Sequence, residues 1–140
     1  MKVWIDGRIV DGSEARVPVT DHGLLYGDGI FEGIRLAGGR VARLDSHLAR
    51  LRHSGRAIGL ELPGGIDGIR EIVLATARAW GRPDGYVRLL VTRGDGAMGV
   101  DPTRCPSPRL ICIACEIELF PAQLLATGVS MVTVSVRRPG

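Results

Sequence analysis

The sequence predicts an α+β domain with a mostly antiparallel sheet and two main helices packed on it. Asp6-Gly7 and Gly38-Gly39 each separate two short apolar segments, which is the pattern of a tight β-hairpin turn. Apolar residues alternate along residues 29–36 and 86–93, whereas they recur at helical spacing in residues 66–80. Strands joined by short hairpins pair in the antiparallel sense, and separate helices pack on such a sheet. A chain of 140 residues is long enough for one domain with its own core.

The chain is predicted to begin with a hairpin. Its two strands are expected at Val3–Ile5 and Arg8–Val10, on either side of the Asp6-Gly7 turn. Ala15–Thr20 is then expected to run extended at an edge of the sheet, where Pro18 would be tolerated.

The glycine-rich stretch that follows is predicted to be a loop, a strand, a Gly-Gly turn and a second short strand. Four glycines in this stretch are unusual for a plain strand, because glycine loses more backbone entropy on folding than other residues and adds no side-chain packing. They are Gly23, Gly27, Gly29 and Gly33. Alternation places Phe31, Gly33 and Arg35 on one strand face. That face combines an aromatic ring, an open patch for close approach and a guanidinium, which suits the wall of a site for a planar anion. Glu32 falls on the apolar face, where we expect a hydrogen-bonded buried carboxylate.

Two amphipathic helices are expected. Asp45 suits the N-cap of the first helix. Its apolar face consists of Leu48, Leu51 and Ile58, and its polar stripe, which faces the glycine-rich strand, consists of His47, Arg50 and Ser54. The second helix covers residues 66–80 and places Trp80 in the core.

The second half of the chain is predicted to add strands around a long loop. Tyr86 and Arg88 share one face of a strand over Tyr86–Arg93. Gly94–Pro108 is a long loop rich in glycine and proline, and such loops are often functional. The remaining predictions are buried strands at Leu110–Ile117 and Val129–Val136, with a helical turn at Pro121–Ala126 between them.

Composition argues against several classes of function. The formal charge is +3 and the seventeen arginines are spread along the chain with few aromatic residues, which does not favour nucleic-acid binding. No apolar run approaches the ~18–20 residues needed to cross a membrane, and the first residues do not resemble a signal peptide. We therefore expect a cytoplasmic protein without a nucleic-acid or membrane partner.

The cysteines and histidines predict no metal site. Cys112 and Cys115 are spaced as C-x-x-C inside a predicted strand, so they point to opposite faces and cannot share one metal ion. With Cys105 they make an odd set without a disulfide framework, and we interpret them as structural thiols. The three histidines are scattered; they are His22, His47 and His53.

Two sequence blocks resemble a known family. They are LLYGDGIFEGIRLAGGRVARLDSHLARLRHSG, beginning at Leu24, and GYVRLLVTRGDGAMGVDP at residues 85–102. Both resemble the N-terminal half of the class IV (fold type IV) pyridoxal-phosphate aminotransferases, above all the branched-chain amino-acid aminotransferases. D-amino-acid aminotransferases and aminodeoxychorismate lyase are relatives. The resemblance runs from about Val3 to about Val136 and implies that residues 1–140 are the small N-terminal domain of such an enzyme.

The resemblance implies roles for basic residues. Arg50, in His-Leu-Ala-Arg-Leu, matches the position that holds the phosphate of pyridoxal 5'-phosphate, and a guanidinium fork suits a phosphate. The alternative is a solvated helix arginine. Tyr86 matches a residue near the substrate α-carboxylate and Arg88 one that steers anions, whereas the alternative for Arg88 is an ion pair within the domain. This Tyr-x-Arg pair is typical of the type that uses L-branched-chain substrates.

The resemblance also implies the wall of a substrate pocket. Phe31 and Tyr26 match its apolar wall, with Tyr26 reaching a partner subunit's site, and Arg35 matches an arginine at the pocket edge. Met98-Gly99-Val100 matches a loop that relatives insert into the neighbouring protomer, which implies a homodimer or higher homo-oligomer. The alternatives are aromatic residues of an ordinary core and an ordinary surface loop.

One residue that the chemistry needs is missing from these 140 residues. Pyridoxal-phosphate enzymes hold the cofactor as a Schiff base on a lysine, and Lys2 is the only lysine present. The resemblance places the catalytic lysine in a second domain, so we expect this chain alone to be an inactive fragment. The complete enzyme is expected to exchange amino groups between L-branched-chain amino acids and 2-oxoglutarate. The alternatives are a D-amino-acid aminotransferase, an aminodeoxychorismate lyase, and a non-catalytic dimerisation or ligand-binding module.

Overall fold

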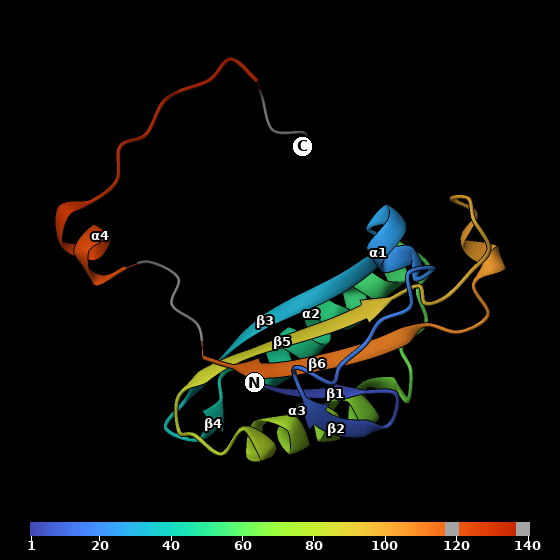
Figure 1. The fold of residues 1–140 in the computed structure, drawn as a ribbon, viewed down its shortest axis with the longest axis horizontal. Helices are drawn as coiled ribbons and strands as arrows, with labels where there is room; N and C mark the ends of the chain where they lie inside the picture. The colour runs from blue at the N-terminus through green and yellow to red at the C-terminus, as the bar shows by residue number, and fades with distance from the viewer. Residues whose placement is uncertain (117–120, 137–140) are drawn as a thin grey trace.

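Six strands form one antiparallel sheet in the computed structural model, which describes residues 1–116 and 121–136. The strands are β1 (Lys2–Ile5), β2 (Arg8–Asp11), β3 (Gly29–Ala37), β4 (Arg40–Val41), β5 (Gly85–Thr92) and β6 (Arg109–Cys115). Their order across the sheet is β2-β1-β6-β5-β3-β4. The long strands β3, β5 and β6 therefore form its middle, with the short strands β1 and β2 at one end and the short strand β4 at the other (Figure 1).

Both predicted hairpin turns are confirmed. Asp6 and Gly7 have φ angles of 49° and 83°, and Gly38 and Gly39 have φ angles of 55° and 74°. Two successive residues with positive φ match the right-handed twist of the flanking strands, and this is why Asp-Gly and Gly-Gly are favoured there. The β1–β2 and β3–β4 pairs follow directly from these two turns.

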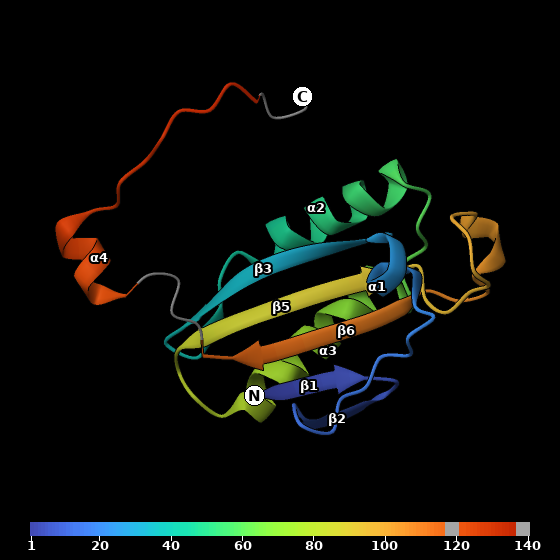
Figure 2. The ribbon, with the colours of Figure 1, turned by 45° about the horizontal axis from the view of Figure 1, so that its top comes forward.

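Two long helices cover one face of the sheet, as Figure 2 shows. They are α2 (Leu44–Ala57) and α3 (Gly65–Trp80), and the described residues also form α1 (His22–Tyr26), a 3-10 turn (Pro102–Arg104) and α4 (Ala122–Thr127). Leu48 and Leu51 of α2 and Val73 of α3 are buried against Ile34 and Leu89 of the sheet. The predicted α+β class, with a mostly antiparallel sheet and two main helices packed on it, is confirmed.

The other sheet face is covered only in part. Val3, Ile5 and Ile111 form a small buried cluster on β1 and β6, and Ala15 packs against it. Over β3 and β5 this face stays open, and Phe31 is exposed there. The uncovered part of the sheet is thus the part that holds the predicted site residues.

The predicted ends of the first helix are wrong in two respects. Arg43 precedes α2 in the left-handed conformation and caps it with no side chain, so Asp45 is not the N-cap. Asp45 instead lies in the first turn, where its Oδ1 is 2.6 Å from Nη2 of Arg70, and this ion pair joins α2 to α3. Ile58 lies after the last helical residue, so it no longer follows the helical period and is exposed rather than buried.

Two predicted extended segments are also wrong. Residues 129–136 are exposed and form no strand, because no described strand lies beside them to complete a ladder of hydrogen bonds. Figure 1 shows this segment and α4 away from the sheet. Ala15–Thr20 forms no strand either. Strand β6 ends at Cys115, and Ile117 lies outside the described residues.

Other predictions about single residues agree with the structure. Trp80 packs half-buried against the core, and α4 replaces the predicted helical turn with nearly the same bounds. Cys112 is buried beneath the helices, where burial raises the pKa of its thiol to about 11, whereas Cys115 is half-buried and lies opposite Tyr86. All three cysteines are free thiols. Among the described residues, no helix is long and apolar enough to span a membrane.

Arg93 joins the sheet to the loop after α2. Its Nε and Nη2 donate to the Asp28 carboxylate at 2.9 and 3.0 Å, and its guanidinium also donates to the carbonyl oxygens of Ile58 and Gly59. Arg93 and Asp28 have exposed side-chain fractions of 11% and 22%. A partly buried charge pair in which each guanidinium nitrogen donates a hydrogen bond holds its geometry, because breaking it would leave a charge unpaired away from water.

We predict that Arg93→Ala lowers the free energy of unfolding by about 3–5 kcal/mol, because Asp28 and two carbonyl oxygens lose their donors. The matched control is Arg82→Ala, which removes an exposed pair with Glu116 and should cost at most about 1 kcal/mol. Urea unfolding followed by circular dichroism measures both. Equal effects for the two variants would contradict the structural role of Arg93.

Candidate functional site

Strand β3 has an open edge. Along Gly29–Leu36 it pairs with β5 on one side, but on the other side only Leu36 and Ala37 pair, with β4. Between Gly29 and Ile34 no other described strand meets that side. An unpaired strand edge exposes backbone N–H and C=O groups. Side chains from both faces of β3 can therefore contact a ligand or a protein segment that binds along this edge.

On the helix side of this edge, Glu32 is buried and fully hydrogen-bonded. Nε of Arg50 donates to Oε1 at 2.8 Å, Nη2 of Arg50 donates to Oε2, and Nδ1 of His47 lies 2.8 Å from Oε2. Because a carboxylate only accepts, the His47 nitrogen is the donor. The expectation of a hydrogen-bonded buried carboxylate at Glu32 is confirmed.

The pKa of Glu32 is set by two opposing effects, its burial and the hydrogen bonds from Arg50 and His47. Burial by itself raises the pKa of Glu32, but the hydrogen bonds from Arg50 and His47 outweigh it, so the pKa lies below the ordinary value of 4.5. The hydrogen bond to Glu32 in turn raises the pKa of Arg50. The exposed fraction is 2% for the Glu32 side chain and 64% for that of Arg50. The buried Glu32 carboxylate thus binds the Nε and Nη2 edge of the Arg50 guanidinium. The remaining nitrogen, Nη1, has no hydrogen-bond partner among the described residues and could bind an anion.

The sequence pattern explains why these three residues meet. Alternation along β3 turns Glu32 toward the helices, opposite Leu89. His47 and Arg50 are one helical turn apart and so share a face of α2. The prediction that this polar stripe faces the glycine-rich strand is confirmed for both residues.

The opposite face of β3 carries a second cluster. Gly33 lies beside Arg88 and Arg35 beside Tyr86 in the β3–β5 register. The Arg88 guanidinium stacks on the Phe31 ring at 3.9 Å from its centroid, and Nη1 of Arg88 donates to the Tyr86 hydroxyl at 3.1 Å. Cation–π contact and hydrogen bond together fix the direction of Arg88.

Gly33 does not leave the open patch that the sequence predicted. The Tyr86 side chain lies across it, and a Cβ at position 33 would overlap the Tyr86 hydroxyl. Glycine is needed here because the tyrosine ring must cross the strand, so the space is filled by the protein itself. The planar wall is therefore made by Phe31, Arg88 and Tyr86 together.

This second cluster carries uncompensated positive charge. Neither Arg88 nor Arg35 has a carboxylate partner among the described residues, so the alternative of an ion pair within the domain finds no support there. Two arginines above an open aromatic surface attract anions. The structure thus brings Phe31, Arg35, Tyr86 and Arg88 onto one face, with Arg50 on the other face of the same edge strand.

Helix α1, which ends at Tyr26, and the long loop lie together at one end of the sheet (Figure 2). The Tyr26 hydroxyl accepts a hydrogen bond from the backbone N–H of Gly99 at 2.8 Å. Met98 and Val100, on either side of Gly99, are exposed. These residues form a third group, separate from the cluster around Arg50 and from the cluster around Arg88.

Sequence reasoning missed helix α1 and gave Glu32 no part in the site. Asp21 caps α1 by accepting from the Gly23 N–H at 2.8 Å, and Gly27 ends it in the left-handed conformation. Asp before a turn of helix and Gly after it were the available signals. For Glu32 the signal was its alternation toward a helix stripe that holds His47 and Arg50.

Lys2 lies away from both clusters. Its Nζ is 2.7 Å from Oδ1 of Asp11. It sits on β1, which β6 and β5 separate from β3, a distance of roughly 14 Å at the usual strand spacing. Among the described residues there is also no group of His, Cys, Asp and Glu that could hold a metal ion.

Comparison with known proteins gives a consistent match. The model of the family described as amino-transferase class IV matches residues 29–140. The chain is 44% identical over 138 residues to the "Putative branched-chain-amino-acid aminotransferase" of Methanocaldococcus jannaschii, covering 99% of this chain and 47% of that protein. The chain therefore spans about half the length of this curated relative.

Solved structures match the same region. The branched-chain amino acid aminotransferase of Escherichia coli superposes with a TM-score of 0.79 at 30% identity, covering 87% of this chain and 42% of that chain. The 4-amino-4-deoxychorismate lyase of Pseudomonas aeruginosa gives 0.73 at 36% identity, covering 91% and 44%. The branched-chain aminotransferase of the thermophilic archaeon Thermoproteus uzoniensis, solved with norvaline, gives 0.74 at 36% identity, covering 84% and 41%.

We predict that Glu32→Gln lowers the free energy of unfolding by about 1–3 kcal/mol at neutral pH, because a charge-assisted grip on Arg50 and His47 is lost. The folded-state pKa of Glu32 is depressed, so its contribution is complete above the ordinary value of 4.5 and is lost as the pH falls through the folded-state pKa. The difference between variant and unaltered chain should therefore shrink in acid.

Urea unfolding at neutral pH and at about pH 3 measures this difference. Glu61→Gln, at an exposed position, is the matched control and should change little at either pH. A Glu32→Gln effect of the same size at both pH values would contradict an ionised, hydrogen-bonded Glu32.

Proposed function

The chain belongs to the class IV amino-transferase family, and on this premise we propose that it is the N-terminal domain of a pyridoxal-phosphate-dependent aminotransferase. The observation that carries the proposal is the Glu32–Arg50 pair at the open edge of β3, next to the aromatic and arginine cluster of the opposite face. One cluster suits a phosphate and the other a carboxylate, so a small ligand that carries both can be held across a single strand. We expect the enzyme to act in the cytoplasm.

The residues of this chain fit pyridoxal 5'-phosphate at its phosphate end. Arg50 is the predicted phosphate ligand, and its exposed guanidinium keeps Nη1 free of other described hydrogen-bond partners. Glu32, which also accepts from His47, holds the Arg50 guanidinium on its buried side, so the exposed side stays available to a phosphate. When bound, the cofactor would supply the aldehyde and the electron sink of transamination. The chain's own part is to anchor the phosphate and orient the ring.

The opposite face supports the substrate side of the proposal. Tyr86 and Arg88 would bind the α-carboxylate and steer acidic co-substrates such as 2-oxoglutarate, and Arg35 adds positive charge at the edge. Phe31 offers an apolar surface to a branched side chain. We therefore propose L-branched-chain amino acids as donors, which agrees with the names of the Methanocaldococcus jannaschii, Escherichia coli and Thermoproteus uzoniensis proteins.

Two parts of the proposed enzyme come from outside the described domain. Lys2 is held by Asp11 away from the site, so the Schiff-base lysine would belong to a second domain packed against the open edge of β3. A second copy of the chain would receive the apolar tip Met98–Val100, which is exposed here together with Tyr26. The proposed assembly is a homodimer or a higher homo-oligomer of two-domain protomers.

We predict a division of roles between two arginines in the two-domain enzyme. Arg50→Ala should weaken cofactor binding by about 2–3 kcal/mol, because a charge-assisted contact to phosphate is removed. Arg88→Ala should raise KM for acidic co-substrates and leave cofactor affinity unchanged. Titration with pyridoxal 5'-phosphate and steady-state kinetics measure the two effects. Arg52→Ala, at an exposed position of the same helix, is the control, and equal losses of both properties in both variants would contradict the division.

We predict that the 140-residue chain alone forms no stoichiometric covalent adduct with pyridoxal 5'-phosphate and does not turn over L-leucine or L-valine. The only side-chain amine is that of Lys2, which is paired with Asp11 on β1 and is separated from β3 by β6 and β5. Incubation, borohydride reduction and peptide mass mapping test this. Near-complete labelling of Lys2 together with turnover would overturn the assignment of the lysine to a second domain.

A further inference from the structure

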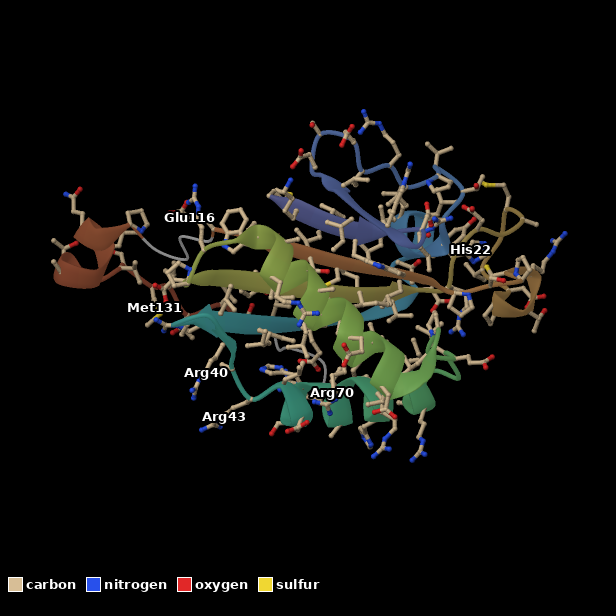
Figure 3. The ribbon with its side chains drawn as sticks, turned by 90° about the horizontal axis from the view of Figure 1, so that it is seen from below. His22, Arg40, Arg43, Arg70, Glu116 and Met131 are labelled. Atoms are coloured by element: carbon tan, nitrogen blue, oxygen red, sulfur yellow. The ribbon has the colours of Figure 1, made fainter. Side chains whose placement is uncertain are left out.

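His22 is a buried histidine with an exposed fraction of 1% that the proposed chemistry does not use. Its Nε2 lies 2.9 Å from the carbonyl oxygen of Ala97, in the middle of the long loop. Because a carbonyl oxygen only accepts, Nε2 must carry the proton and donate. The backbone N–H of His22 donates to the Gly94 carbonyl at 2.9 Å, so one residue contacts the loop at two points. Figure 3 shows His22 at the end of the sheet, beside this loop.

Tyr26 continues this contact one helical turn later. The rings of His22 and Tyr26 meet edge to face, with centroids 4.9 Å apart and planes at 82°. The Tyr26 hydroxyl accepts from the Gly99 N–H at 2.8 Å. The two rings share a face of α1 because they are four residues apart, and they bind the loop at two positions that are also close in sequence.

The space around the imidazole is full. A Cβ at Gly96 would overlap both Nε2 of His22 and Sγ of Cys105, so the loop backbone is pressed directly against the ring. Beyond this contact the side chains of Met98 and Val100 point outward and are exposed. The apolar tip is therefore presented by a backbone whose place depends on α1, although the tip itself touches little else.

We propose that His22 is a positioning residue that sets the place of Tyr26 and of the Met98–Val100 tip as one unit. The proposal rests on the proposed function in one respect only: Tyr26 and the tip are taken to line the substrate pocket of the neighbouring copy. Loss of the imidazole donor should then disturb substrate affinity, whereas the phosphate site at Arg50, on β3 and α2, should be unaffected.

Amide hydrogen exchange in the 140-residue chain tests the positioning role without any assumption about the reaction. His22→Phe keeps an aromatic ring against Tyr26 but removes the donor to Ala97, whereas His22→Gln keeps a donor. We expect the Gly99 amide to exchange about tenfold faster in His22→Phe and to stay near the original rate in His22→Gln, since one lost hydrogen bond changes a local opening equilibrium by that order. Tyr26→Phe, which removes the Gly99 acceptor directly, marks the upper limit.

Amides of β5 serve as the folding control. Unchanged Gly99 exchange in a His22→Phe chain with protected β5 amides would overturn the positioning role. If His22→Phe fails to fold, the unaltered chain decides by nuclear magnetic resonance: a slowly exchanging Nε2–H with coupling to the Ala97 carbonyl supports the role, and its absence overturns it.

The two-domain enzyme tests the link to the pocket. In His22→Phe we expect KM for the amino acid to rise by about tenfold, with unchanged affinity for pyridoxal 5'-phosphate and rescue by His22→Gln. A loosened Gly99 amide with unchanged KM would overturn the pocket part of the proposal. The exchange result stands apart from this arm, so a failure of the proposed function is distinguishable from a failure of His22 as a positioning residue.

Discussion

The interaction on which the site depends is the grip of the buried Glu32 carboxylate on Arg50. A carboxylate removed from water must be paired, and here a helix that carries both His47 and Arg50 supplies the pairing. The contact fixes α2 against β3 and at the same time leaves most of the Arg50 side chain exposed. The Arg50 guanidinium therefore neutralises the buried Glu32 carboxylate with one edge and can bind a ligand with its exposed edge.

The same strand explains why two different kinds of recognition can lie so close together. Neighbouring residues of a strand point to opposite faces, so Phe31 and Glu32 belong to two clusters although they are adjacent in sequence. One cluster uses hydrogen bonds to a buried acid, and the other uses an aromatic ring and Tyr86 to direct Arg88. Because the edge of β3 between Gly29 and Ile34 lacks a partner strand among the described residues, both clusters reach the same border of the domain.

Local signals predicted most of the fold. The Asp6-Gly7 and Gly38-Gly39 turns were readable because only residues that tolerate positive φ fit them. The prediction of a strand at 129–136 was wrong, because alternation shows only that a segment is suited to a sheet and does not show that a neighbouring strand is present. Helix α1 escaped notice because five residues with a glycine among them carry no helical period. Asp45 resembled an N-cap, but α2 begins one residue before it.

The site was predictable in its residues more than in its arrangement. Family resemblance pointed to Arg50, Tyr86 and Arg88, but not to the acid that holds Arg50 or to the position of the Tyr86 side chain over Gly33. A glycine in a strand indicates that another group approaches the backbone closely, but the sequence does not distinguish a ligand from a side chain of the same protein. His22, judged as one of three scattered histidines, needed the tertiary contact with Ala97 to become meaningful.

The most direct test of the account is a crystal structure of the two-domain enzyme with pyridoxal 5'-phosphate bound. We predict a phosphate oxygen within about 3 Å of Nη1 of Arg50, while Nε of Arg50 still donates to Glu32 and the ring lies along the open edge of β3. A phosphate held by other residues, with the Arg50 guanidinium facing water, would contradict it.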